Sequence, residues 1–166
     1  DNTCGLILSL TNAKDPRLGQ RNARKQTHVN EWTLNNKIIT ELPSTVVGFV
    51  YLIECITLNK KYIGKKLTHF KRSKPPLKGR TNKRHSRVSS DWLTYWGSSD
   101  SLTEDIKRLG LSNFKRTILH TCPSKSQCNY LEAKEQFARC VLERSDYYNN
   151  NIQVRVHGSH ILNKQP

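Results

Sequence analysis

Two tyrosines in neighbouring apolar runs are the residues whose types and spacing first suggest chemistry in this sequence. Tyr51 ends the string G-F-V-Y and Tyr62 begins the string Y-I-G, with Arg72 and Glu132 further along the chain. Hydrolysis of a phosphodiester requires an activated water, a Lewis acid on a phosphate oxygen and a cation that stabilises developing charge. Two phenols can orient or activate the water, a guanidinium can supply the cation, and a carboxylate can bind a metal ion as the Lewis acid. The alternative is a pair of core tyrosines in a β-hairpin, without a chemical role.

Apolar periodicity predicts the elements that must position these residues. The nearly continuous apolar run that contains Tyr51 predicts a strand covered on both faces, and the run at Tyr62 predicts its hairpin partner. Gly110 ends one expected helix, and Ser124 is a capping residue at the start of another. We expect strands at residues 46–56, 61–63, 114–120 and 152–156, and helices at residues 101–109 and 124–142.

Four strings in order along the chain resemble the GIY-YIG nuclease family, which is named for two such tyrosine motifs on adjacent strands. They are G-F-V-Y-L-I, K-Y-I-G-K-K, S-D-W-L-T-Y-W-G-S-S and Y-L-E-A-K-E-Q-F. The gap between Tyr51 and Tyr62 matches the family's usual spacing, and the resemblance covers about residues 47–157. It is nearest to the phage-encoded, free-standing, Seg-like homing endonucleases.

The resemblance implies an α+β fold, the GIY-YIG nuclease fold, in which a small three-stranded central β-sheet is flanked by helices. An N-terminal hairpin around Asn35-Asn36 is expected to extend this sheet. We therefore divide the chain into a basic, poorly ordered N-terminal arm, a hairpin extension, the GIY-YIG nuclease domain and a C-terminal tail. These segments are residues 1–30, 31–47, 48–157 and 158–166.

The resemblance also implies a role for each residue of the site. Tyr51 would accept the proton of the attacking water, directly or through a relay, if nearby cations favour its phenolate. Lys65 and Arg72 would provide positive charge, and Tyr62 would position the water or the phosphate. Glu132 would hold one divalent cation, Mg2+ or another such as Mn2+, completed by waters and DNA oxygens. Asparagines that follow the helix of Glu132 are further candidates for the site: Asn149, Asn150 and Asn151.

The metal ligand has one main competitor. Glu135 lies one helical turn after Glu132, and the sequence favours Glu132 only through the neighbouring apolar Leu131. No paired-carboxylate cluster follows the basic stretch, which disfavours a nuclease with two metal ions.

The arginine of the site has alternatives further along the basic stretch. Pro75-Pro76 shortens the helix that would present Arg72, so Arg84 or His85 could enter the site instead. His69 and His85 are also candidates for a proton shuttle.

The charge of the chain points to a polyanionic partner. Lysine and arginine number 28 against 13 acids, which gives a formal net charge of +15. Double-stranded DNA is the expected partner, and a membrane is disfavoured because no stretch approaches about 20 apolar residues. Five cysteines without a C-x-x-C pair suggest reduced thiols and a cytoplasmic location, in keeping with a phage-infected bacterial host.

Residues 65–87 contain ten of the basic residues and no acid, and we expect a basic loop with a short helix before the prolines. The aromatic string that follows is expected to pack against the sheet and to leave two serines near phosphate. The expected DNA contacts are Lys66, Lys71, Lys74, Lys78, Arg80, Lys83, Arg84, Arg87, Ser98 and Ser99.

The sequence thus predicts a metal-dependent DNA endonuclease, a phosphodiester hydrolase of the phage homing type. A restriction-like or DNA-degrading nuclease on the same fold is one alternative. A noncatalytic basic protein that binds nucleic acid is another.

Overall fold

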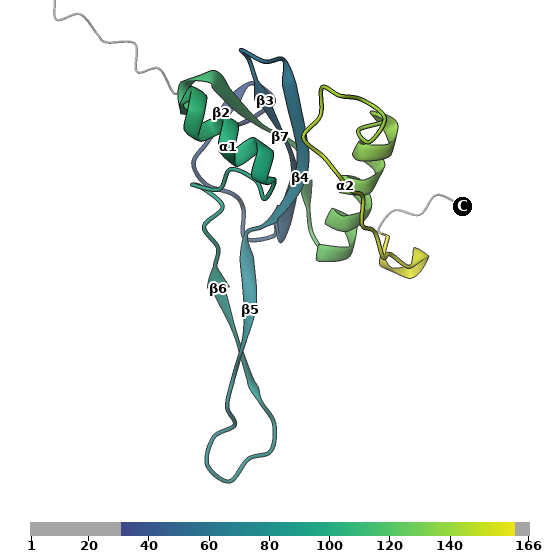
Figure 1. Cartoon of the computed structure of the whole chain (residues 1–166). Coiled ribbons are helices and arrows are strands. Elements are labelled where there is room, and N and C mark those ends of the chain that lie inside the picture. The colour runs from purple at the N-terminus through teal and green to yellow at the C-terminus, as the bar shows by residue number, and fades with distance from the viewer. Residues whose placement is uncertain (1–30, 162–166) are drawn as a thin grey trace, which may run out of the picture.

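A five-stranded sheet forms the centre of the computed structural model, which describes residues 31–161 (Figure 1). Its strand order is β2-β1-β7-β3-β4, and a separate two-stranded sheet is formed by β5 and β6. No helix among the described residues is long and apolar enough to cross a membrane. The strands are β1 (Trp32–Leu34), β2 (Lys37–Ile39), β3 (Gly48–Cys55), β4 (Lys60–Leu67), β5 (His69–Lys74), β6 (Arg84–Ser89) and β7 (Phe114–Cys122). The helices are α1 (Asp100–Leu109) and α2 (Lys125–Ala138), with 3-10 turns at Leu111–Asn113 and Gly158–His160.

The interior strand β3 is buried on both faces, as its continuous apolar run predicts. Alternate residues of a strand point to opposite faces, so Phe49, Tyr51 and Ile53 pack into one core with Leu102 of α1. Val50 and its neighbours on the other face pack into a second core with residues of α2. The two helices accordingly cover opposite faces of the sheet (Figure 1).

The sheet has five strands where three central strands were expected, because the N-terminal hairpin adds β1 and β2 to the same sheet. The hairpin turn is at Asn35 and Asn36, whose φ values of 50° and 61° suit a two-residue turn with positive φ at both positions. Strand β1 then pairs in parallel with β7, where Trp32 lies opposite Arg116. A parallel pairing between segments more than 80 residues apart leaves no local pattern in the sequence.

The basic stretch was expected to be a loop with a short helix, and this expectation is wrong. Strand β4 runs on to Leu67, and after Thr68 the chain forms the antiparallel strands β5 and β6. We call residues 69–89 the basic hairpin, which projects away from the five-stranded sheet (Figure 1). The strand expected at residues 152–156 is likewise absent, and those residues form neither helix nor strand.

Buried Arg116 of β7 fixes the aromatic loop between β6 and α1. Its guanidinium lies 4.5 Å from the ring centroid of Trp32 and 4.2 Å from that of Trp96. It also donates hydrogen bonds to the carbonyl oxygens of Leu93 and Tyr95, at 3.0 and 2.9 Å. Burial lowers the pKa of Arg116 to about 10, so the group remains charged at neutral pH.

We predict that Arg116→Met lowers the free energy of unfolding by about 2 kcal/mol, because the substitution leaves two loop carbonyls without their donor. Urea unfolding followed by tryptophan fluorescence measures this change. The matched control is Arg108→Met at an exposed helix position, which should leave the unfolding midpoint unchanged. An Arg116→Met midpoint equal to that of the control would contradict the anchoring role.

Candidate active site

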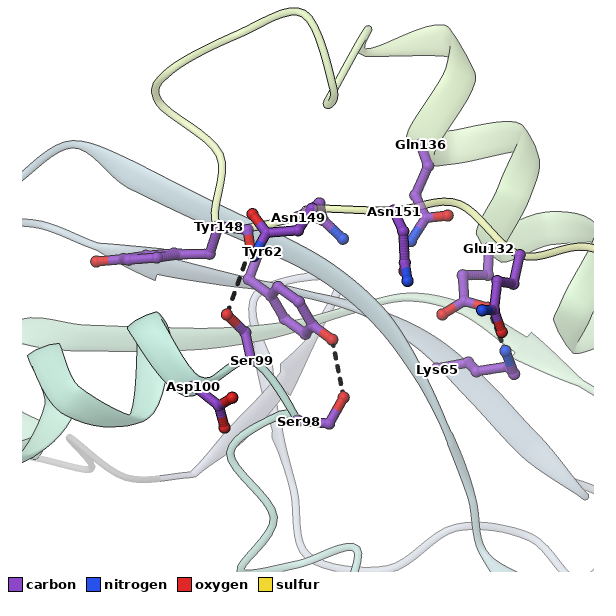
Figure 2. Close-up of a pocket in the computed structure, with 12 residues that line it drawn as sticks. Tyr62, Lys65, Ser98, Ser99, Asp100, Glu132, Gln136, Tyr148, Asn149 and Asn151 are labelled. Carbon is purple, nitrogen blue, oxygen red and sulfur yellow. Dashed lines mark hydrogen bonds and ion pairs between the residues drawn. The ribbon is translucent and has the colours of Figure 1, made fainter.

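An open cleft of about 440 Å3 lies along the outer edge of β4 (Figure 2). The beginning of α1, the middle of α2 and the segment after α2 form its other walls. Its lining is rich in amides and hydroxyls, with two carboxylates and one lysine. The lining residues are Tyr62, Lys65, Ser98, Ser99, Asp100, Glu132, Gln136, Tyr148, Asn149, Asn150, Asn151 and Gln153.

Side-chain amides occupy the outer edge of β4 at the centre of the cleft. The backbone N–H of Ile63 donates to Oδ1 of Asn149 at 3.0 Å, and Nδ2 of Asn149 donates to the Ile63 carbonyl at 2.7 Å. Gln136 of α2 donates to the same carbonyl at 3.2 Å. Both amides are buried. Asn149 therefore bonds to β4 as a further strand would, and it holds the segment after α2 against the sheet.

Tyr62 extends from β4 into the cleft toward the beginning of α1. Its hydroxyl lies 3.1 Å from Oγ of Ser98 (Figure 2). Ser99, the next residue, caps α1 by accepting a hydrogen bond from Leu102. Burial raises the pKa of Tyr62, and the hydrogen bond with Ser98 opposes this rise. The two serines expected near phosphate are thus in the cleft beside this phenol.

Tyr51 lies beneath the cleft and is 1% exposed. Its ring centroid is 6.2 Å from that of Tyr62. A Cβ at Gly64 would lie 2.6 Å from the Tyr51 hydroxyl and 3.0 Å from the Tyr62 ring, so the close packing of the two phenols requires glycine there. Burial raises the pKa of Tyr51 well above its ordinary value, and the phenols of Tyr62 and Tyr95 add to the rise. In this structure the Tyr51 hydroxyl keeps its proton at neutral pH.

The two glutamates of α2 have different surroundings. Glu132 lines the cleft and forms a salt bridge with Lys65 of β4 (Figure 2). Glu135 instead bonds to His120 at 2.7 Å and to Arg139 at 2.9 Å, and it does not line the cleft. Of the two competing acids, Glu132 is therefore the one that could hold a metal ion in the cleft.

The structure places Arg72 outside the cleft. It lies on β5 of the basic hairpin, opposite Ser86, and the helix expected to present it is absent. Its proposed replacements are in the same hairpin, where Arg84 contacts the Pro75 carbonyl and His85 contacts Ser73. The other site candidates within the basic hairpin, none of which lines the cleft, are the proposed proton shuttle His69 and the expected DNA contacts Lys71, Lys74, Lys78, Arg80, Lys83 and Arg87.

Lys66 also has a position that differs from the expected one. Its amino group lies 2.7 Å from Oδ1 of Asp91 and 3.5 Å from the ring centroid of Tyr95. The side chain is 11% exposed. Lys66 thus joins β4 to the aromatic loop, and among the described residues that line the cleft Lys65 alone carries a positive charge.

Sequence reasoning missed several residues of the cleft. Gln136 follows Glu132 by four positions and so shares its helix face, which is a signal that could have identified it. Asp100 and Tyr148 enter the cleft only because α1 and the segment after α2 meet at the edge of β4, and no local pattern marks them. The other missed lining residue is Gln153.

A mixed α/β fold with paired strand tyrosines beside a helix glutamate is that of a GIY-YIG nuclease domain. The family model described as "Putative endonuclease segE, GIY-YIG domain" matches residues 32–152, and the chain belongs to this family. No curated protein and no solved structure matches the chain.

The raised pKa of Tyr51 predicts a loss of stability in alkaline solution. The pKa of Tyr51 in the folded state is above the unfolded value of about 10. The contribution of its protonated phenol to the free energy of unfolding is therefore complete below pH 10 and is lost as the pH rises further. The fall in unfolding free energy between pH 9 and pH 11, measured with urea, should be smaller in Tyr51→Phe than in the wild type. The control Tyr130→Phe, at an exposed position of α2, should retain the wild-type fall. Equal falls in wild type and Tyr51→Phe would contradict the prediction.

Proposed function

We propose that the protein is a metal-dependent endonuclease that hydrolyses phosphodiester bonds of double-stranded DNA in the cleft beside β4. The observation that carries this proposal is that Tyr62 and Glu132, from a strand and a helix of the family domain, line one cleft. The net charge of +15 favours a nucleic acid substrate. We further propose the role of a phage homing-type enzyme, which acts in the cytoplasm of the infected bacterial host.

Glu132 is the proposed ligand of one divalent cation, Mg2+ or Mn2+. The described residues hold no group of three histidines, cysteines or acids that could enclose an ion. The Glu132 carboxylate, in a cleft that is also lined by amide and hydroxyl oxygens, fits a hard ion that keeps several waters and binds substrate oxygens. When bound, such an ion polarises a phosphate oxygen and lowers the pKa of a coordinated water. Lys65 would then release Glu132 and turn toward the phosphate.

The side chains of the cleft have complementary proposed roles. Tyr62, held by Ser98, orients the water or a phosphate oxygen through its hydroxyl. Lys65 supplies positive charge to the phosphate as the transition state forms. Tyr51 is proposed as a positioning residue, because its buried, protonated phenol supports the Tyr62 ring and Gly64 from below. This role replaces the proton acceptor that the family resemblance implied.

The metal role of Glu132 is tested with isosteric amides at the two helix positions. Glu132→Gln should lower cleavage of supercoiled plasmid in Mg2+ by about a hundredfold or more, because the amide has no charge to hold the ion. Glu135→Gln is the matched control, since its carboxylate bonds to His120 and Arg139 away from the cleft. It should cleave at a rate near that of the wild type.

Full activity of Glu132→Gln would overturn the assignment of Glu132 as the metal ligand of the cleft. Plasmid that stays intact with wild-type protein in both Mg2+ and Mn2+ would overturn the proposed function.

A second experiment separates the positive charge in the cleft from that on the basic hairpin. Lys65→Gln should lower the single-turnover cleavage rate at saturating protein by about tenfold or more, because it removes charge beside the reacting phosphate. Arg72→Gln, on β5, should weaken DNA binding and leave that saturated rate close to the wild-type value. A saturated rate that falls in Arg72→Gln and not in Lys65→Gln would assign the catalytic cation to the hairpin.

A further inference from the structure

The basic hairpin carries a concentration of positive charge that its own structure does not neutralise. Residues 69–89 contain eight lysines and arginines and no acid: Lys71, Arg72, Lys74, Lys78, Arg80, Lys83, Arg84 and Arg87. Within residues 31–161 none of these eight forms a salt bridge, although seven ion pairs occur elsewhere in that range. All eight side chains are exposed.

The strand register makes this charge self-repulsive. Lys71 lies directly opposite Arg87, and Lys74 lies directly opposite Arg84. Like charges at directly opposed positions of an antiparallel pair destabilise it, and a two-stranded hairpin is at best marginally stable by itself. A polyanion bound to the hairpin would relieve both pairs. The arrangement therefore favours a binding element over a purely structural one.

The two opposed pairs lie on opposite faces of the hairpin. Directly opposed residues share a face, and successive pairs along the strands alternate between faces. Lys74 and Arg84 are on one face with Arg72, whereas Lys71 and Arg87 are on the other. A hairpin that lay flat on a single phosphate backbone would need cations on one face only. Cations on both faces suit a groove, where a phosphate backbone runs along each side.

The base of the hairpin is firmly joined to the strand that lines the cleft. Thr68, between β4 and β5, is 2% exposed, and its hydroxyl donates to the Val46 carbonyl at 2.8 Å. Across the hairpin, Ser90 donates through its backbone N–H to the Thr68 carbonyl at 2.9 Å and through its hydroxyl to the Leu67 carbonyl at 2.6 Å. These bonds fix the direction of the hairpin relative to β4.

We propose that the basic hairpin enters a groove of duplex DNA, contacts the phosphates of both strands and so determines where the cleft meets the backbone. The proposal rests on the proposed function, because it takes the cleft to be the site of DNA hydrolysis. DNA binding by the hairpin is nevertheless measurable without cleavage. Nine residues separate Lys65 from Lys74, or about 30 Å at about 3.3 Å per residue. At about 3.4 Å per base pair, the hairpin contacts lie within about nine base pairs of the scissile phosphate, on one side of it.

The test uses the full chain, a chelator and a duplex oligonucleotide, so that binding is measured without hydrolysis. One variant carries Lys71→Thr and Arg87→Thr, a second carries Lys74→Thr and Arg84→Thr, and a third combines all four. Threonine suits a strand and removes the repulsion, so the urea midpoint should not fall in any of them. The matched control replaces four exposed lysines outside the hairpin with threonine or glutamine and removes the same charge: Lys107, Lys115, Lys125 and Lys134.

Each hairpin variant should bind duplex DNA more weakly than the control. The slope of log affinity against log salt should become shallower by about 1.8 for each pair removed, since each lost phosphate contact accounts for about 0.9. Hydroxyl-radical footprints should shorten on one side in the fourfold variant only, and binding to single-stranded DNA should change far less than binding to duplex.

Three results would overturn the proposal. Affinity and footprint equal to those of the control would show that the hairpin does not contact DNA. An effect confined to one pair would place a single face of the hairpin on the DNA. Equal losses for single-stranded and duplex DNA would rule out groove binding. Because no metal is present, none of these results depends on whether the protein cleaves DNA.

Discussion

The outer edge of β4 is closed by side-chain amides, and the candidate active site depends on this arrangement. An open strand edge presents unpaired N–H and carbonyl groups, which proteins normally cover or pair. Asn149 bonds to both backbone groups of Ile63, and Gln136 adds a second donor to its carbonyl. A pair of amides covers far less of the edge than a sixth strand would. At the start of the strand, the backbone of Lys61 bonds to Asp146 and Tyr148, so the segment after α2 also covers this part of the edge. The cleft lies beside these contacts, and Tyr62 and Lys65 extend into it.

The continuity of one chain segment links this cleft to the basic hairpin. Strand β4 carries Tyr62 and Lys65, and after Thr68 the same segment becomes the first strand of the hairpin. The hydrogen bonds at Thr68 fix the junction, while Lys66 and Arg116 hold the aromatic loop that leads to Ser98. The cleft and the basic hairpin also differ in how their positive charges are paired. The cleft pairs its one lysine with a glutamate, whereas the hairpin keeps its cations exposed.

The sequence by itself determined the elements whose signals are local. The continuous apolar run of β3 requires cover on both faces, and that strand is buried on both. Ser124 caps α2 and Gly110 ends α1 as predicted, because a cap depends only on residues within one turn. The two tyrosine motifs lie on adjacent antiparallel strands, as the two apolar runs predict, and the turn at Asn35-Asn36 followed from its chemistry.

Only the tertiary structure decided how these elements meet. The helix pattern favoured Glu132 over Glu135 only through the neighbouring Leu131, and the packing of α2 against β4 and β7 separated the two acids. Arg116 shares a strand face with Phe114 and Ile118, but its burial between two tryptophans was not predicted, because both partners come from distant segments. The position of Arg72 depended on whether β6 would pair with β5. The parallel pairing of β1 with β7 likewise joins residues more than 80 positions apart. Such contacts form between segments distant along the chain, and the energy that selects them comes from packing, which no local window of sequence contains.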